Sequence, residues 1–252
     1  MPTITPSSIL TETPQPPEWV IDRFLPRDTI TILAGLEGIG KSSLSYALAL
    51  SVATGQSFLD RMTTQLRVLY FDSENSKPDF SEYLRQLWIG MGSPDPKALD
   101  EFLRIEHFSL AVDWQPRFKA ACVAWNPGLV IIDTANSCFS VEDENSNAEA
   151  AEIVSFISQT RPARASVILM KHEREAKDGM GKSVRGAKYW LGAVDQVVYL
   201  NRVGGHPIPP YGLYRTKLTP AKKRAYGLDE AIVINPIMEQ GPYGKSLKLC
   251  RH

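Results

Sequence analysis

One glycine-rich loop, at residues 35–42, constrains the fold of this chain more than any other feature. It reads GLEGIGKS and fits, at every fixed position, the pattern GxxxxGK followed by Ser or Thr. An apolar segment typical of a strand, residues 29–34, precedes the loop, and a helical segment, residues 42–54, follows it. The glycines allow backbone N–H groups to turn inward around phosphate groups, and the start of a helix adds the positive end of its dipole. The loop therefore predicts a phosphate-binding turn in an α/β fold.

The residues of this loop have expected roles. Lys41 is expected to bridge the β- and γ-phosphates of a nucleoside triphosphate, and the hydroxyl of Ser42 is expected to hold Mg²⁺. The expected nucleotide-binding residues are Gly35, Leu36, Glu37, Gly38, Ile39, Gly40, Lys41, Ser42 and Ser43. A second run, GMGKS at residues 179–183, repeats the end of the motif but has Ala176 where the first glycine should stand. We interpret that run as a mobile loop.

Along the rest of the chain, short apolar segments alternate with amphipathic ones, which is the pattern of βαβ units. The expected strands are residues 29–34, 67–72, 102–107, 129–133, 166–171 and 196–200, and the expected helices are residues 42–54, 78–91, 116–125, 147–159 and 187–193. Segments 211–218 and 231–234 indicate antiparallel edge strands. The expected fold class is α/β, a mostly parallel twisted sheet flanked by helices with antiparallel C-terminal edge strands.

The first 17 residues differ from the rest in composition. Five of the 18 prolines lie there, so we expect residues 1–17 to form an extended or disordered arm. Two interpretations of this arm are open, a flexible terminus and a segment that binds a partner. Residues 18–252 are expected to form one domain.

Charge and cysteine content exclude several functional classes. Lys plus Arg and Asp plus Glu each number 28, so no overall positive field attracts nucleic acid or acidic membranes, and any such binding must be local. The three cysteines are scattered and form no CxxC pair, which argues against a disulfide framework or a zinc site. The N-terminus has no basic region followed by an apolar one, so it does not resemble a signal peptide. We expect a cytoplasmic protein without a membrane partner.

Two further segments supply carboxylates at the ends of expected strands. Asp133 ends the apolar run LVIID and is the expected second protein ligand of Mg²⁺. The next residue is Thr134, so a carboxylate that activates water must come from elsewhere. Glu74 lies just beyond the strand that ends at Asp72, at the edge of a parallel sheet where ligands bind. Glu74 is therefore the expected water-activating residue, with a solvated loop acid as the alternative.

Together these motifs resemble the RecA-like ATPases, and within them the RepA-like hexameric helicase group with its AAA-type ATP-binding domain. The resemblance covers about residues 17–225 and is carried by GLEGIGKSS, YFDSEN, LVIIDT, ILMKH and RGAKYWLGAVDQVVYL. It implies a RecA-like P-loop fold, ATP and Mg²⁺ as ligands, and a homo-oligomer, either a hexamer or a filament, with ATP between neighbouring subunits.

The resemblance also implies roles for three further residues. His172, at the end of an expected strand, corresponds to the γ-phosphate sensor, with a satisfied polar strand cap as the alternative. Lys217 is the first candidate and Arg215 the second for a cation that a neighbouring subunit's site receives, where it would stabilise charge on the transferring phosphoryl group. The alternative is a solvated basic strand.

Two loops of RecA-like motors face a central pore, and they differ here in charge. Residues 137–147 contain three acidic residues and no Lys or Arg, so this loop should repel phosphate. Residues 173–185 supply the candidate DNA contacts, Lys177, Lys182 and Arg185. The alternative for this loop is a solvated charged face. A further alternative for Arg185 is contact with a neighbouring subunit.

Two functional hypotheses remain open from the sequence. The first is a DNA helicase, translocase or loader in replication or recombination of a mobile element, acting on single-stranded DNA. The second is an ATP-switched oligomeric assembly or regulatory module that binds a protein partner through its N-terminal arm. A nucleotide kinase is disfavoured because no Arg-rich lid is evident and Glu74 would have no role.

Overall fold

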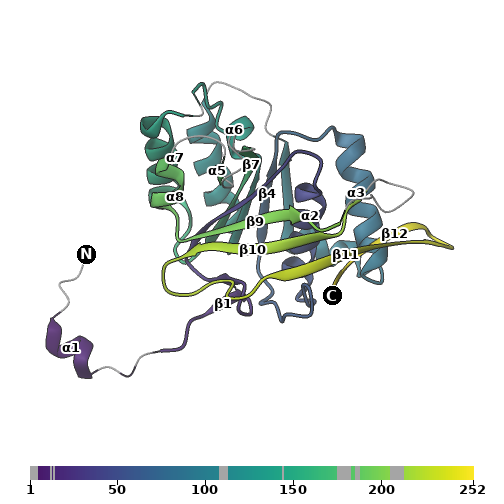
Figure 1. The fold of residues 1–252 in the computed structure, drawn as a ribbon, viewed down its shortest axis with the longest axis horizontal. Helices are drawn as coiled ribbons and strands as arrows, with labels where there is room; N and C mark the ends of the chain where they lie inside the picture. Colours follow the sequence, from purple (N-terminus) through teal and green to yellow (C-terminus); the bar gives the residue numbers. More distant parts are fainter. Residues whose placement is uncertain are drawn as a thin grey trace.

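One large sheet forms the centre of the molecule, with helices on both of its faces (Figure 1). The computed structural model describes residues 5–11, 13, 15–107, 113–143, 145–174, 183–184, 188–204 and 213–252. The strand order is β12-β11-β10-β9-β3-β7-β6-β4-β5. The mutually parallel strands are β3 (Ile30–Gly35), β4 (Val68–Asp72), β5 (Leu103–His107), β6 (Leu129–Asp133), β7 (Ser166–Arg174) and β9 (Gln196–Arg202). The antiparallel strands that follow are β10 (Thr216–Lys223), β11 (Ile232–Gly241) and β12 (Gly244–Arg251). The expected α/β fold class is confirmed.

The central strands are buried at every position because helices cover both faces of the sheet. One face packs against α2 (Lys41–Thr54), α3 (Lys77–Gly90) and α4 (Pro96–Phe102). The other packs against α5 (Trp114–Trp125), α6 (Ala135–Cys138), α7 (Asn147–Thr160) and α8 (Lys188–Ala193). Alternate residues of β3, β4, β6 and β7 enter the two separate cores. Within the described ranges, no helix is both long enough and apolar enough to cross a membrane.

The strand order brings the motif-bearing strand ends to one edge. Strand β7 lies between β3 and β6, and β4 follows β6, all parallel. In this register Gly35 lies opposite His172, and Asp72 lies opposite Asp133. The carboxyl ends of four strands therefore carry the glycine-rich loop, the histidine and both aspartates side by side, which is where open α/β sheets bind ligands.

The N-terminal arm differs from its expectation. Residues Pro6–Thr11 form helix α1, where the proline content predicts an extended or disordered chain. The difference has a local reason, because a proline is tolerated in the first helical turn and the next proline of the sequence is Pro14. Helix α1 lies apart from the body of the molecule in Figure 1, and the side chain of Leu10 is 84% exposed.

Several strand boundaries also differ from those expected. Strand β7 continues to Arg174, so His172 lies inside the strand rather than at its end. Strand β10 begins at Thr216, whereas the expected strand began at residue 211, and residues 211–212 lie outside the described residues. The unexpected elements are the β1 (Trp19–Ile21) and β2 (Leu25–Pro26) hairpin, α4, α6, β8 (Ser183–Val184) and β12. None of these differences adds or removes a strand of the expected parallel set, which corresponds to β3, β4, β5, β6, β7 and β9.

Candidate functional site

The glycine-rich loop adopts a backbone that its glycines make possible. Gly38 and Gly40 have φ values of 68° and 96°, in the left-handed region where a side chain is strained. Gly35 is required for a different reason, because a Cβ there would lie 2.8 Å from the carbonyl oxygen of Leu200 on β9. Helix α2 begins at Lys41, directly after Gly40, so the N–H groups of its first turn have no partner within the helix. They remain available to an anionic ligand.

The ammonium group of Lys41 is held at the opening of this loop. Lys41 is buried, and its Nζ donates to the carbonyl oxygens of Gly35 at 3.1 Å and Leu36 at 2.9 Å. Nζ also lies 3.4 Å from Nδ1 of His172. Burial lowers the pKa of Lys41, and the charges of Asp133 and Glu74 oppose that effect. The charges of Glu37 and Glu173 act on this ammonium in the same direction. A buried ammonium at the opening of a glycine-rich loop is suited to a phosphate group.

His172 connects Lys41 to Glu74. Its Nε2 lies 3.0 Å from Oε1 of Glu74, while its Nδ1 faces Lys41. The neutral tautomer with the proton on Nε2 satisfies both contacts, since Nδ1 then accepts and Nε2–H donates. The hydrogen bond from His172 lowers the pKa of Glu74, so Glu74 is ionised at neutral pH. The Glu74 side chain remains 39% exposed, which leaves room for a water molecule at the carboxylate.

Asp133 lies beside this line of residues and is fully buried. Its Oδ2 accepts a hydrogen bond from the Tyr70 hydroxyl at 2.8 Å, whereas its Oδ1 has no hydrogen-bond partner among the described residues. Burial raises the pKa of Asp133 to about 6, and the hydroxyls of Tyr70 and Ser42 oppose that rise. A buried carboxylate oxygen without a partner, next to the Ser42 hydroxyl, fits a hard cation with oxygen ligands such as Mg²⁺.

Sequence reasoning missed a second buried carboxylate, Asp72, and the tyrosines that serve both aspartates. Asp72 accepts hydrogen bonds from the backbone N–H groups of Glu74 and Asn75 and from the Tyr46 hydroxyl. The signal was present in the sequence, because VLYFD repeats the pattern of LVIID, an apolar strand that ends in aspartate. The hydroxyls of Tyr46 and Tyr70 carried no such signal, since aromatic residues in buried elements are usually part of an apolar core.

The two candidate trans cations lie on the antiparallel side of the sheet. Lys217 pairs in register with Asn201 of β9 and Val233 of β11. Thr216, next to Lys217, lines a narrow cleft together with Gly40 and Ser43. Because successive residues of a strand point to opposite faces, the Lys217 side chain points away from the cleft beside its own glycine-rich loop. Arg215 directly precedes β10. Their roles in a neighbouring subunit's site stay predictions.

The candidate DNA contacts Lys177, Lys182 and Arg185 lie outside the described residues. Of the other expected pore loop, the structure describes residues 137–143 and 145–147. There the backbone N–H groups of Glu142 and Asp143 face the carboxylate of Glu149 at 3.1 and 3.3 Å. Glu142 and Asp143 are exposed, and repulsion of phosphate by this loop stays a prediction.

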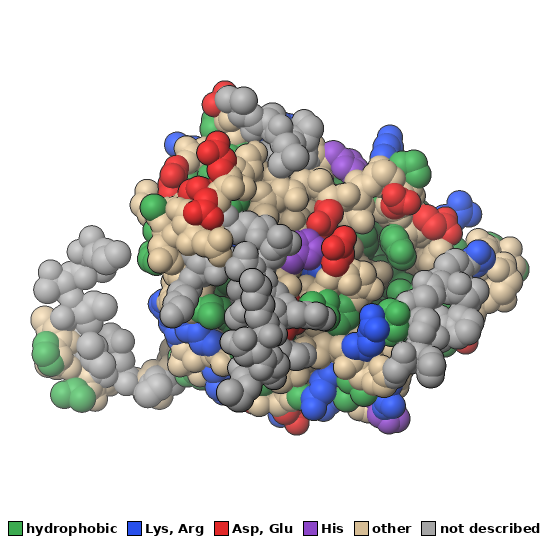
Figure 2. All heavy atoms as spheres, turned by 45° about the horizontal axis from the view of Figure 1, so that its top comes forward, with side chains coloured by type: hydrophobic (Ala, Val, Ile, Leu, Met, Phe, Trp, Pro, Cys, Tyr) green, Lys and Arg blue, Asp and Glu red, His purple; other side chains and the backbone are tan. Residues whose placement is uncertain are grey.

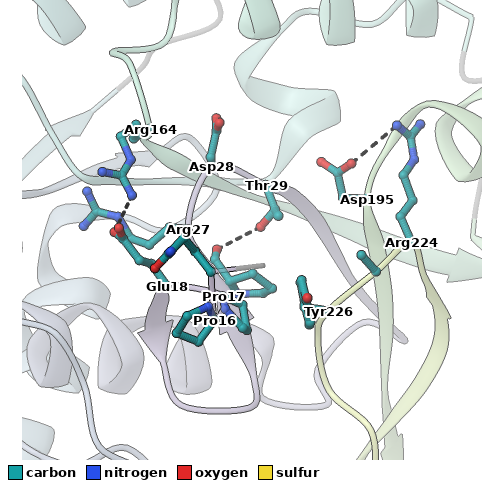
Figure 3. Close-up of a pocket in the computed structure, with 13 residues that line it drawn as sticks. Pro16, Pro17, Glu18, Arg27, Asp28, Thr29, Arg164, Asp195, Arg224 and Tyr226 are labelled. Carbon is teal, nitrogen blue, oxygen red and sulfur yellow. Dashed lines mark hydrogen bonds and ion pairs between the residues drawn. The ribbon is translucent and has the colours of Figure 1, made fainter. Parts of the chain in front are cut away.

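A cavity of about 400 Å³ lies between the proline-rich segment and the strand starts, far from these residues in the fold (Figure 3). Two ion pairs lie in its wall, Arg164 with Glu18 and Arg224 with Asp195, whereas Nε of Arg27 is buried there without a hydrogen-bond partner among the described residues. Thr29 donates to the carbonyl oxygen of Pro26 in the same wall. This cavity therefore differs from the loop edge in its chemistry, because its unpartnered atom is a donor of an arginine rather than a carboxylate oxygen beside a glycine-rich turn.

Comparison with known proteins agrees with this geometry. Residues 2–178 match the family model described as an AAA domain. The chain belongs to the AAA-domain family. The matched residues of this AAA-domain protein include the glycine-rich loop, Glu74, Asp133 and His172, whereas Lys217 and Arg215 lie beyond them. The family places the chain among the P-loop ATPases, which generally use ATP and Mg²⁺. No curated protein matches the chain in sequence.

A solved structure shows the same fold as this AAA-domain protein. It is a KaiC-like protein from the hyperthermophilic archaeon Pyrococcus horikoshii, with a TM-score of 0.60 and 14% sequence identity. The similarity covers 91% of this chain and 93% of that chain. The RecA-like P-loop fold expected from the sequence is confirmed.

Proposed function

We propose that this chain binds Mg-ATP and hydrolyses it at the carboxyl edge of its parallel strands. The observation that carries the proposal is the continuous line from Lys41 through His172 to Glu74. It joins a phosphate-binding cation to an ionised carboxylate. A structural glycine-rich turn would require neither a buried ammonium nor an orphaned oxygen on Asp133.

Each of these residues has a role in phosphoryl transfer to water. Lys41 neutralises negative charge on the phosphates, and Glu74 polarises the attacking water and accepts its proton. His172 contacts both Lys41 and Glu74. Its position therefore depends on whether a γ-phosphate lies between Lys41 and Glu74. Ser42 and Asp133 hold Mg²⁺, which when bound supplies further neutralisation of phosphate charge.

We further propose that the chain assembles into a ring or filament in which Lys217, with Arg215 as second candidate, completes the site of a neighbouring subunit. The support is that Lys217 points away from the cleft beside its own loop and that the described Lys41–His172–Glu74 line contains one cation. The resemblance to RepA-like hexameric helicases favours a DNA helicase, translocase or loader of a mobile element. Lys177, Lys182 and Arg185 are the candidate DNA contacts.

A second candidate function is an ATP-switched assembly module that binds a protein. It is favoured by the acidic charge around residues 137–147, the first of the two expected pore loops. Glu142, Glu149 and Glu152 surround Trp114 and Phe139 there. In Figure 2, which turns the top of Figure 1 forward, most acidic side chains lie in the upper half of the face, whereas basic ones lie both in the lower half and at the upper right. An acidic surface repels DNA phosphates and suits a basic protein partner.

An ATPase assay with and without single-stranded DNA, at two salt concentrations, distinguishes these functions. A DNA motor requires stimulation by DNA that falls steeply as salt rises, whereas an assembly module requires ATP-dependent oligomers, seen by light scattering, whose hydrolysis ignores DNA. Lys41→Ala is the negative control and should abolish hydrolysis. Lys182→Ala should leave nucleotide binding intact. Absence of hydrolysis by the wild-type chain in all these conditions would contradict the proposed function.

Mixing two inactive variants tests the shared site. Lys217→Ala lacks the donated cation, and Glu74→Gln lacks the water-activating carboxylate. In a mixture, some interfaces combine the intact Lys217 of one subunit with the intact Glu74 of its neighbour, so activity above that of either variant is expected. Equal activity of the mixture and the separate variants would count against Lys217 as the donated cation, and Arg215→Ala would then replace it.

A further inference from the structure

The segment that carries Glu74 is held by one buried side chain, Asp72. Its Oδ1 accepts hydrogen bonds from the backbone N–H groups of Glu74 at 3.1 Å and Asn75 at 3.0 Å. The Asn75 side-chain amide lies 3.3 Å from Oδ1 and 3.4 Å from Oδ2 of the same carboxylate. An aspartate that binds the N–H groups two and three residues ahead fixes the local turn. Asp72 therefore sets the path of the backbone at Glu74.

The other oxygen of Asp72 is tied to the helix that follows the phosphate loop. Oδ2 accepts a hydrogen bond from Tyr46 of α2, and the Asn75 side-chain amide donates to the same hydroxyl at 3.1 Å. Burial and the hydrogen bond to Asp72 raise the pKa of Tyr46, so its hydroxyl keeps its proton and donates. Asp72 is fully buried, and both of its oxygens are occupied by protein donors. It is not available as a metal ligand.

The Glu74 side chain itself has few constraints. It is 39% exposed, and its carboxylate lies 3.0 Å from Nε2 of His172. A long, half-exposed side chain keeps one geometry only if hydrogen bonds or packing fix the backbone that carries it. The turn held by Asp72 fixes the backbone of Glu74, and His172 orients its carboxylate.

We propose that Asp72 is a positioning residue for ATP hydrolysis, which fixes the Glu74 backbone against α2 so that the Glu74 carboxylate meets the attacking water. The proposal rests on the proposed function, since it assigns Asp72 a role in the same reaction. Asp72 acts through Glu74 and touches neither nucleotide nor metal. Its removal should therefore lower kcat and leave nucleotide affinity nearly unchanged.

The test is a double-mutant cycle of Asp72→Ala with Glu74→Gln, read by single-turnover hydrolysis and by binding of a fluorescent ATP analogue. In the wild-type background we expect Asp72→Ala to lower the rate ~10- to 100-fold, with analogue affinity within about threefold, because small displacements of a catalytic group cost this much. In the Glu74→Gln background the same substitution should change the residual rate by less than about twofold. Asp72→Asn, which keeps an acceptor for both N–H groups, should restore the rate to within about fivefold of wild type.

A matched control separates positioning from general loss of stability. Asp195 also accepts a backbone N–H bond, from Ile30 at 2.8 Å, but lies at the opposite end of the strands. Asp195→Ala should lower the unfolding temperature without lowering the single-turnover rate. If Asp72→Ala does not fold, Asp72→Ser takes its place in the cycle.

The outcomes separate this proposal from the proposed function. Additive effects in the cycle, an equal loss in Asp72→Asn, or failure of all three Asp72 variants to fold would overturn the positioning role while wild-type hydrolysis stands. A wild-type chain that does not hydrolyse ATP would overturn both. A rate loss in Asp72→Ala accompanied by an equal loss of analogue affinity would overturn the positioning role alone.

Discussion

Two aspartates end adjacent strands of the sheet, at matched positions, and serve opposite purposes. Asp72 on β4 lies opposite Asp133 on β6, and both are fully buried. Asp72 accepts hydrogen bonds from two backbone N–H groups, a tyrosine and an asparagine. Asp133 accepts one from Tyr70 and keeps Oδ1 without a partner among the described residues. The two carboxylates are equally buried but differ in their hydrogen bonds. Both oxygens of Asp72 accept from protein donors, whereas one oxygen of Asp133 remains able to bind a ligand.

The physical basis of this difference is the cost of burying a charge. An ionised carboxylate away from water is unfavourable unless donors or a cation compensate it. At Asp72 the turn to Asn75 brings the donors, so the end of β4 is complete without a ligand. At Asp133 one oxygen accepts from Tyr70 but the other has no donor among the described residues, and burial raises the pKa of Asp133 to about 6. A cation at the end of β6, as in the proposed Mg²⁺ site, would supply the missing compensation.

The largest expected effect belongs to the carboxylate that the Asp72 turn carries. Glu74→Gln should lower kcat by ~10²- to 10⁴-fold, the usual contribution of a positioned general base, and should leave ATP binding intact. The measurement is steady-state hydrolysis beside calorimetric titration with Mg-ATP. Full turnover in this variant would show that the end of β4 carries no catalytic group. The hydrogen bonds of Asp72 would then only stabilise the local turn.

The next effect tests the other strand end. Asp133→Asn should lower Mg²⁺-dependent hydrolysis by ~100-fold or more and should raise the Mg²⁺ concentration needed for half-maximal rate, because the expected metal ligand loses its charge. Asp22→Asn is a matched control, since Asp22 is a partly exposed aspartate paired with Arg23. An unchanged Mg²⁺ requirement in Asp133→Asn would mean that the orphaned oxygen does not face the metal.

The sequence predicts much of this comparison but not its decisive part. Asp133 and the glycine-rich loop are local patterns, an apolar strand that ends in acid and a glycine spacing, so both are visible without a structure. The contact of Tyr46 with Asp72 joins residues 26 positions apart, and nothing in the α2 sequence distinguishes that hydroxyl from a core aromatic. The register that brings His172 opposite Gly35 depends on the insertion of β7 between β3 and β6. Such proximity follows from the strand order, which the local sequence patterns do not specify.

The same reason explains which elements were missed. Helix α4 had a usable signal, since Asp95 caps it and Pro96 begins it, but at seven residues it is shorter than a clear helical period requires. Strand β12 alternates between exposed and buried residues only weakly and depends on β11 for its hydrogen bonds. The sequence did not reveal elements that are too short for a clear period or that depend on hydrogen bonds to a neighbouring strand.

A smaller effect concerns stability against pH. Because the pKa of Asp133 is raised to about 6 from its ordinary value of 3.8, the folded chain binds this proton more tightly than the unfolded chain. Stability without Mg²⁺ should therefore fall as pH rises from about 4 to about 6, by up to ~3 kcal/mol from this group, and change no further above that range. Urea unfolding in EDTA across this range measures the slope. Asp133→Asn should remove that contribution, and an identical slope in the variant would assign it to other groups.

The smallest effect compares the two tyrosines. Tyr70→Phe removes a hydrogen bond to a carboxylate that has one free oxygen, whereas Tyr46→Phe removes one of several donors to Asp72. We expect Tyr70→Phe to lower the free energy of unfolding at pH 8 by ~2 kcal/mol and Tyr46→Phe by ~1 kcal/mol, since hydrogen bonds to a poorly compensated charge contribute more. Added Mg-ATP should recover more of the loss in Tyr70→Phe, because a cation at Asp133 compensates the same charge. Equal losses and equal recovery would mean that the two aspartates are equivalent in the folded chain, which is the result that would most directly break the comparison.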